Sequence, residues 1–114
     1  MPISQYIYGS GVIGTTEWSL TANASGVRSQ TNTGVYQTFI NVSGMLTGDE
    51  YQFKVYETVA QSPRLPLYQS NVVGPQSPQL IVFPSLVLMS GWDITAESRA
   101  GTARNILWSI RSVS

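Results

Sequence analysis

The clearest pattern along this chain is a short alternation of apolar and polar residues. Between Glu50 and Thr58, the apolar residues Tyr51, Phe53 and Val55 are each followed by a more polar residue. Successive side chains of a β-strand point to opposite faces, so this spacing gives the segment one apolar and one largely polar face. We therefore predict a half-buried strand over residues 50–58.

Other runs rich in β-branched and aromatic residues recur between clusters of Gly, Pro, Asn, Ser and Asp. The strands predicted from them are Ser4–Tyr8, Thr16–Leu20, Val35–Val42, Leu67–Val73, Gln79–Phe83, Leu86–Met89, Trp92–Ala96 and Asn105–Val113. Many short strands separated by turn residues are typical of antiparallel all-β domains. We expect residues 1–114 to form one all-β domain, an antiparallel β-sandwich of the jelly-roll or immunoglobulin-like type.

Turn residues and prolines add detail to two of these strands. Residues 35–42 are expected to pair with residues 50–58, because a connection that contains two glycines is compatible with a hairpin. Pro84 cannot donate a ladder hydrogen bond. The apolar run from Leu80 to Met89 is therefore expected to bend or bulge at this proline, or to lie at a sheet edge.

The C-terminal run over residues 105–113 fits two kinds of structure. Ile106, Trp108 and Ile110 alternate as in a strand, whereas Ile106, Ile110 and Val113 also fall at helical spacing. We predict a strand, because Trp and Ile favour a pleated surface and a Gly-Thr turn precedes the run.

The N-terminal segment combines apolar residues with closely spaced glycines. Gly9 and Gly11, followed by Gly14, are similar to a glycine-rich phosphate loop, but no Gly-Lys-Ser/Thr ending and no helical pattern follow them. We expect residues 1–13 to be an arm with a flexible glycine-rich hinge, which either completes the domain's own sheet or adds a strand to a neighbour. The residues expected at an assembly interface are Ile3, Tyr6, Ile7 and Tyr8 of this arm, together with Arg64 and Leu65 of the proline-flanked connection 61–66.

The amino-acid composition excludes several classes of catalytic and metal-binding site. It has no histidine and no cysteine, which rules out histidine-dependent triads, thiolate nucleophiles and His/Cys zinc sites within these residues. The carboxylates show no Asp-x-Asp-x-Asp-Gly calcium loop, and Asp49 and Glu50 are interpreted as a solvated turn. Trp92 and Trp108 lie within apolar alternation, so we expect core packing rather than a carbohydrate platform. We predict no enzyme activity, no catalytic or metal site, no cofactor and no small-molecule substrate.

Charge and hydropathy limit the partners and the location. Only 11% of residues are charged, the formal net charge is +0, and the arginines are spread along the chain, which disfavours a nucleic-acid partner. The first residues lack the basic start and apolar run of a signal peptide, and the most apolar run is about half of a membrane span. We expect synthesis in the cytoplasm and no membrane partner. The neutral polar surface and the apolar arm favour self-assembly, with a homotrimer expected.

Several segments together resemble one group of proteins. They are Gly14–Leu20, Gly34–Ile40, Glu50–Glu57, Ser90–Thr95, Gly101–Arg104 and Trp108–Arg111. This set resembles small, cysteine-free virion proteins of tailed bacteriophages, which are similar in size and all-β character to capsid decoration or cement proteins. The resemblance implies a structural protein on the capsid surface of a virion, with the major capsid protein as its partner, and it brings no catalytic residue.

Two other hypotheses belong to different functional classes. A tail- or fibre-associated β-sandwich could use exposed aromatic side chains to bind host cell-surface glycans. A carboxylate-based hydrolase would require two acidic residues within about 10 Å of each other in a cleft.

Overall fold

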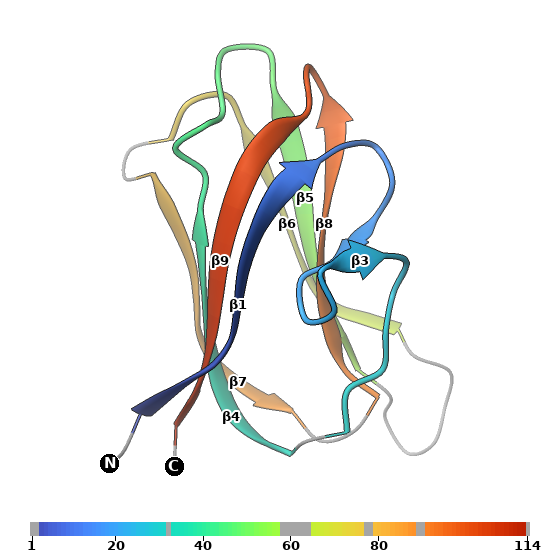
Figure 1. Ribbon diagram of the computed structural model, residues 1–114, viewed down its shortest axis with the longest axis vertical. Helices are drawn as coiled ribbons and strands as arrows, with labels where there is room; N and C mark the ends of the chain where they lie inside the picture. The colour runs from blue at the N-terminus through green and yellow to red at the C-terminus, as the bar shows by residue number, and fades with distance from the viewer. Residues whose placement is uncertain (1–2, 32, 58–64, 77–78, 89–90, 114) are drawn as a thin grey trace.

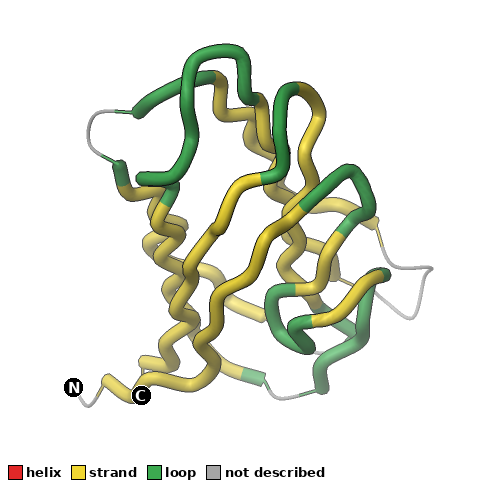
Figure 2. Tube along the Cα trace, turned by 45° about the horizontal axis from the view of Figure 1, so that its top comes forward, coloured by secondary structure: helices red, strands yellow, loops and turns green. Residues whose placement is uncertain are grey.

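The computed structural model describes residues 3–31, 33–57, 65–76, 79–88 and 91–113, and these residues form nine β-strands and no helix (Figures 1 and 2). The strands are β1 (Ile3–Ile13), β2 (Trp18–Ser19), β3 (Ala24–Ser25), β4 (Gly34–Asn41), β5 (Glu50–Glu57), β6 (Leu65–Val73), β7 (Leu80–Leu88), β8 (Asp93–Ala100) and β9 (Arg104–Val113). The all-β class expected from the sequence is confirmed, and the residues predicted as a C-terminal strand form β9.

The strands form two antiparallel sheets that face each other (Figure 1). One sheet has the order β1-β9-β4-β7, and the other has the order β3-β2-β8-β5-β6. When the short β3 is set aside, the first strand pairs with the last, the second with the second to last, and so on inward to the β5–β6 hairpin. This winding is that of a jelly roll, so the topology selects that type over the immunoglobulin-like alternative.

Strand β7 shows both features predicted from its proline. It lies at the edge of its sheet, and its register with β4 shifts so that Pro84 and Ser85 both oppose Gln37. The proline is tolerated because the bulge and the open edge remove the need for its missing N–H. The two segments predicted around it therefore form one bulged strand.

The expected hairpin between β4 and β5 does not form. β4 pairs with β7 and β9, whereas β5 lies in the other sheet between β6 and β8. The connection between the two strands crosses the end of the sandwich, where Val42 and Met45 are buried. Crossing places the apolar face of β4 opposite that of β5 across the core, which buries both faces.

The N-terminal residues are part of a strand rather than a hinged arm. β1 pairs with β9 from the Ile3–Val113 pair to the Ile13–Arg104 pair, so it completes the chain's own sheet, one of the two alternatives expected from the sequence. Gly9 of β1 has a packing role. A Cβ atom at Gly9 would lie 2.9 Å from the ring of Trp108, so only glycine leaves room for the indole at this point.

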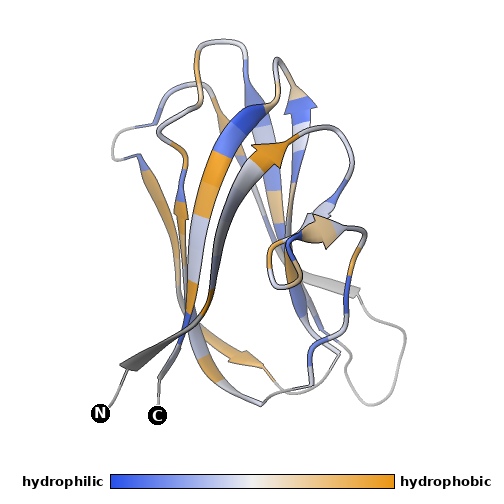
Figure 3. Ribbon diagram, viewed as in Figure 1, coloured by the Kyte–Doolittle hydropathy of each residue, from blue (hydrophilic) through white to orange (hydrophobic). Residues whose placement is uncertain are grey.

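The core lies between the sheets and contains most of the large apolar side chains. Trp92 is fully buried with its ring 4.8 Å from that of Tyr36, and the indole N–H of the buried Trp108 donates a 2.8 Å hydrogen bond to the Leu20 carbonyl. Core packing of these two tryptophans, predicted from their alternation, is confirmed. Burial alternates along β9, where Ile106, Trp108 and Ile110 are buried, and Figure 3 shows apolar and polar bands on this strand.

Asp49 is buried, whereas the sequence suggested a solvated turn. Its carboxylate accepts a 2.7 Å bond from Arg104 Nε and bonds from the backbone N–H groups of Leu46 and Thr102. These bonds join the β4–β5 connection to the turn before β9. The hydrogen bond from Arg104, followed by that from the Leu46 N–H, lowers the pKa of Asp49.

We predict that replacing Gly9 with alanine destabilises the fold. Gly9→Ala should lower the free energy of unfolding by about 1–3 kcal/mol, because the new methyl group must displace the Trp108 ring. Gly11→Ala is the matched control, since a Cβ atom there would be at an ordinary 3.8 Å from Asn23 Oδ1. Urea unfolding of both variants tests this, and equal stability would contradict the packing role of Gly9.

We also predict that Asp49 stabilises the fold only when it is ionised. A carboxylate whose pKa is lowered by folding stabilises the folded state above its unfolded pKa, and this contribution is lost as the pH falls through the folded pKa. The melting temperature of Asp49→Asn should therefore lie well below that of the unmodified protein at pH 6 and approach it at pH 3. Glu97→Gln is the control, because its 3.7 Å pair with the half-exposed Arg99 contributes less than about 0.5 kcal/mol. A pH-independent difference for Asp49→Asn would be the contrary result.

Candidate interaction surface

The outward face of the β1-β9-β4-β7 sheet is the strongest candidate for a functional surface. Directly paired residues of an antiparallel sheet share one face. One outward row runs from Tyr8 through Ser109 and Phe39 to Val82, and the next runs through Leu107, Asn41 and Leu80. Strands far apart in the sequence thus contribute to a single continuous face (Figure 1).

Exposed apolar side chains gather on this face. Among the described residues, eight large hydrophobic side chains are exposed, and six of them belong to this sheet. The six are Tyr8, Val12, Leu80, Val82, Val87 and Leu107. Single exposed hydrophobic residues are ordinary on protein surfaces, but a group of them on one sheet face indicates an interaction site.

All the charged residues in the four strands of this sheet are basic. All six acidic residues of the chain lie outside its four strands, which carry only Arg104 and Arg111. Arg104 is paired with Asp49, whereas no carboxylate of the described residues forms an ion pair with Arg111. The Arg111 guanidinium lies 4.2 Å from the centre of the Phe39 ring, and its Nε donates a 3.2 Å hydrogen bond to Ser109 Oγ. This face therefore combines exposed apolar side chains with neutral polar ones and the guanidinium of Arg111, and it carries no carboxylate.

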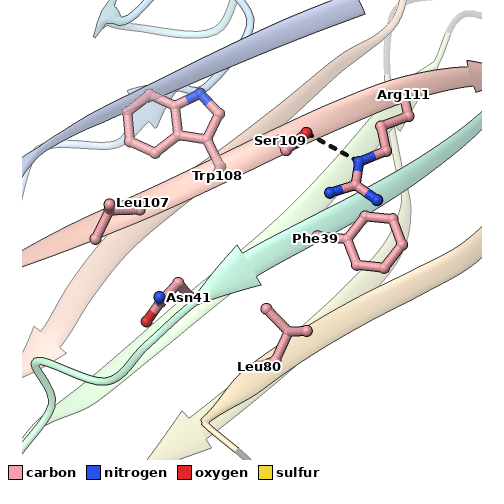
Figure 4. A pocket seen from close by; sticks show the side chains of 7 residues that line it. All are labelled: Phe39, Asn41, Leu80, Leu107, Trp108, Ser109 and Arg111. Atoms are coloured by element: carbon pink, nitrogen blue, oxygen red, sulfur yellow. Dashed lines mark hydrogen bonds between the residues drawn. The ribbon is translucent and has the colours of Figure 1, made fainter. Parts of the chain in front are cut away.

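A shallow, open depression of about 200 Å³ lies beside this arginine (Figure 4). It is lined by Phe39, Asn41, Leu80, Leu107, Trp108, Ser109 and Arg111. Figure 4 shows the side chains of Leu107, Asn41 and Leu80 projecting from three adjacent strands. Asn41, Ser109 and Arg111 contribute polar side-chain groups to this lining, and none of the lining residues is a carboxylate. The depression can accept a protruding apolar side chain, with Arg111 available to a carboxylate beside it.

The interface residues expected from the sequence are distributed over two sheets. Ile3, Tyr6, Ile7 and Tyr8 are all in β1, where Ile7 packs against the core and Tyr8 is exposed. Leu65 begins β6 in the other sheet, and Arg64 lies outside the described residues. No sequence pattern predicted Phe39, Leu107 and Arg111 as interface residues. The absence of acidic residues from four separate strand segments was the signal that could have found this face.

The buried carboxylate of Asp93 is held by hydrogen bonds that connect parts of the fold. It accepts hydrogen bonds from the hydroxyls of Ser19 and Thr21 and from the backbone N–H groups of Arg28 and Ile94, at 2.6–3.0 Å. These bonds attach the segment around β2 and β3 to β8. Burial raises the pKa of Asp93, and the four hydrogen bonds act in the opposite direction. Asp93 is remote from the depression, which it does not line.

Other acidic residues offer no additional site in the described part of the chain. Glu17 Oε2 accepts 2.6 Å hydrogen bonds from Tyr56 and Thr95, which hold it against the second sheet. No group of three or more acidic, histidine or cysteine residues among those described is arranged to hold a metal ion. In the same residues, no helix is long and apolar enough to cross a membrane.

We predict that Asp93 contributes strongly to folding. Asp93→Ala should lower the free energy of unfolding by about 3 kcal/mol, because it leaves two buried and two partly buried donors without their acceptor. Ser43→Ala, at an exposed turn position, should change it by less than about 0.5 kcal/mol. Denaturant unfolding measures both, and a small effect of Asp93→Ala would show that water replaces the lost acceptor.

Comparisons with known proteins leave the family open. The chain matches no protein-family model. No curated protein sequence is significantly similar to it.

Proposed function

We propose that this chain is a structural virion protein that decorates and stabilises a bacteriophage capsid. The single observation that carries the proposal is the apolar, acid-free outward face of the β1-β9-β4-β7 sheet. Burying such a face against a protein lattice removes apolar surface from water, which stabilises the complex without any catalytic group. The binding partner is the major capsid protein, and the location is the capsid surface.

Two further considerations support this proposal. Jelly rolls are common among viral capsid proteins, although they also occur in lectins and in enzymes, so the fold is an analogy and not evidence of function. Many copies on a regular lattice make weak individual contacts effective, because contacts of a linked assembly become intramolecular after the first. A modest face on a small protein is then sufficient.

The face also indicates the chemistry of its partner. An apolar group of the capsid protein fits the depression, and a neighbouring carboxylate fits Arg111, whose guanidinium is already oriented by Phe39 and Ser109. Nucleic acid fits poorly, because a phosphate-binding face requires clustered cations and this face has one. Binding should consequently be only weakly dependent on salt.

A second candidate is glycan binding by a tail- or fibre-associated module. The observation that favours it is the combination of Phe39, Asn41 and Arg111 at the depression, since an aromatic ring beside amide and guanidinium donors suits a sugar. Against it, the guanidinium of Arg111 already stacks on the Phe39 ring. We therefore place capsid decoration first.

We predict that the protein cosediments with purified expanded capsid shells that lack it, and that Val82→Asp weakens this binding about tenfold or more. The variant removes apolar contact area and places a charge in the buried interface. Val73→Asp is the control, because Val73 is the same residue type and is more exposed than Val82, but it lies on β6 of the other sheet. Thermal unfolding establishes that both variants are folded.

The same cosedimentation is repeated at 50 and 200 mM salt, with free duplex DNA as a control ligand. Phosphate-dominated binding loses orders of magnitude in affinity over roughly this salt range, whereas binding by apolar and neutral surface loses much less. Equal effects of the two valine substitutions would place the interface elsewhere. Failure to bind any shell, together with retention on tails or bacterial cell walls, would overturn the proposal in favour of the glycan-binding candidate.

A further inference from the structure

The outer edge of β1 is an open strand edge of unusual length. β1 has eleven residues, and within the described chain it pairs only with β9, so its other side is unpaired. An open edge presents backbone N–H and C=O groups that can pair with another strand.

The other three sheet edges have features that oppose strand addition. β7 contains Pro84 and a bulge, β6 contains Pro66 next to a register shift with β5, and β3 has only two residues. β1 also has a register shift with β9, between Gln5 and Ile7, but it has neither a proline nor a charged residue, which are common means of protecting an edge. From Ile7 to Ile13 its ladder is regular, and this stretch is the longest unprotected edge among the described strands.

Exposed side chains follow the same edge. Tyr8 and Val12 are 73% and 66% exposed, compared with 40% for Leu107 on the neighbouring β9. Both residues belong to the outward face of β1, where an added strand would lie beside them. Cross-strand contacts with aromatic and β-branched side chains are the main stabilising pairs of a sheet.

We propose that β1 of a second copy of this chain occupies this edge in antiparallel orientation. A strand that pairs antiparallel with its own copy is related to it by a two-fold axis, so the same residues serve both partners and the contact closes on itself. The uncharged sequence of β1 allows this pairing without repulsion between like charges. The two four-stranded sheets then join into one continuous sheet.

The geometry therefore favours a dimer over the trimer expected from composition and the apolar arm. Joining the sheets also places two copies of the apolar face side by side, which would double the area available to a lattice. This inference is separate from the proposed function, since self-association involves the edge of β1 whereas shell binding involves the face around Leu107 and Val82.

Light scattering of the free protein at high micromolar concentration tests the inference. We expect a mass of twice the 12.4 kDa chain, and we expect Ser10→Lys to weaken dimerisation by about fivefold or more, because it adds a positive charge to the pairing edge of each copy. Ser10 is exposed on β1, so the substitution is compatible with folding, which circular dichroism verifies. Ser43→Lys is the matched control, because it adds the same charge at an exposed turn away from β1 and should leave the dimer unchanged.

A second measurement uses the absence of cysteine from the chain. Ser10→Cys should be cross-linked to a covalent dimer by a short bifunctional maleimide, whereas Ser43→Cys should give no covalent dimer under the same conditions. A monomeric or trimeric mass for the unmodified protein, or a dimer unaffected by Ser10→Lys, would overturn the inference. Loss of shell binding in Val82→Asp with an intact dimer would separate the two surfaces experimentally.

Discussion

The structure depends on the pairing of the first strand with the last. The β1–β9 ladder extends from Ile3–Val113 to Ile13–Arg104, and it joins segments about a whole chain length apart. Such contacts bear the full loop-closure cost, so they form only when the winding of the intervening strands has brought the ends together. Gly9 makes the ladder compatible with the core, because the Trp108 indole occupies the space of a side chain there.

Buried polar groups fix the connections around this ladder. The Tyr51 hydroxyl donates to the Ile13 carbonyl and accepts from the Arg104 N–H, which ties the end of β1 to the start of β9. Asp49 performs a similar role for the crossing between β4 and β5. Both residues sit at the margin of an apolar core, where an unpaired polar group is costly and a fully bonded one specifies a single arrangement.

The two proposed interaction surfaces are the sheet face and the strand edge that remain exposed when the jelly roll closes. Closure buries one face of each sheet, and the segment around β2 and β3 also covers part of the outward face of β8, where Asp93 and Thr95 are buried. The outward face of the β1-β9-β4-β7 sheet lacks acidic residues and carries most of the exposed apolar side chains of the described residues. The same closure makes β1 an edge strand. The docking face and the pairing edge are thus two results of one topology. They share the side chains of Tyr8 and Val12, whereas Val82 on the opposite edge strand tests the docking face without altering β1.

The positions of several strands could be predicted from the sequence alone, because strand periodicity depends on residues that are neighbours in the chain. Alternation located β5 and β9, and the missing N–H of Pro84 predicted a bulged edge strand. Tertiary structure decided which strands pair, and the expected β4–β5 hairpin failed because both apolar faces are buried better across the core than side by side. It also decided the burial of Asp49 and the surface around Arg111, since both are assembled from segments whose proximity no local pattern encodes.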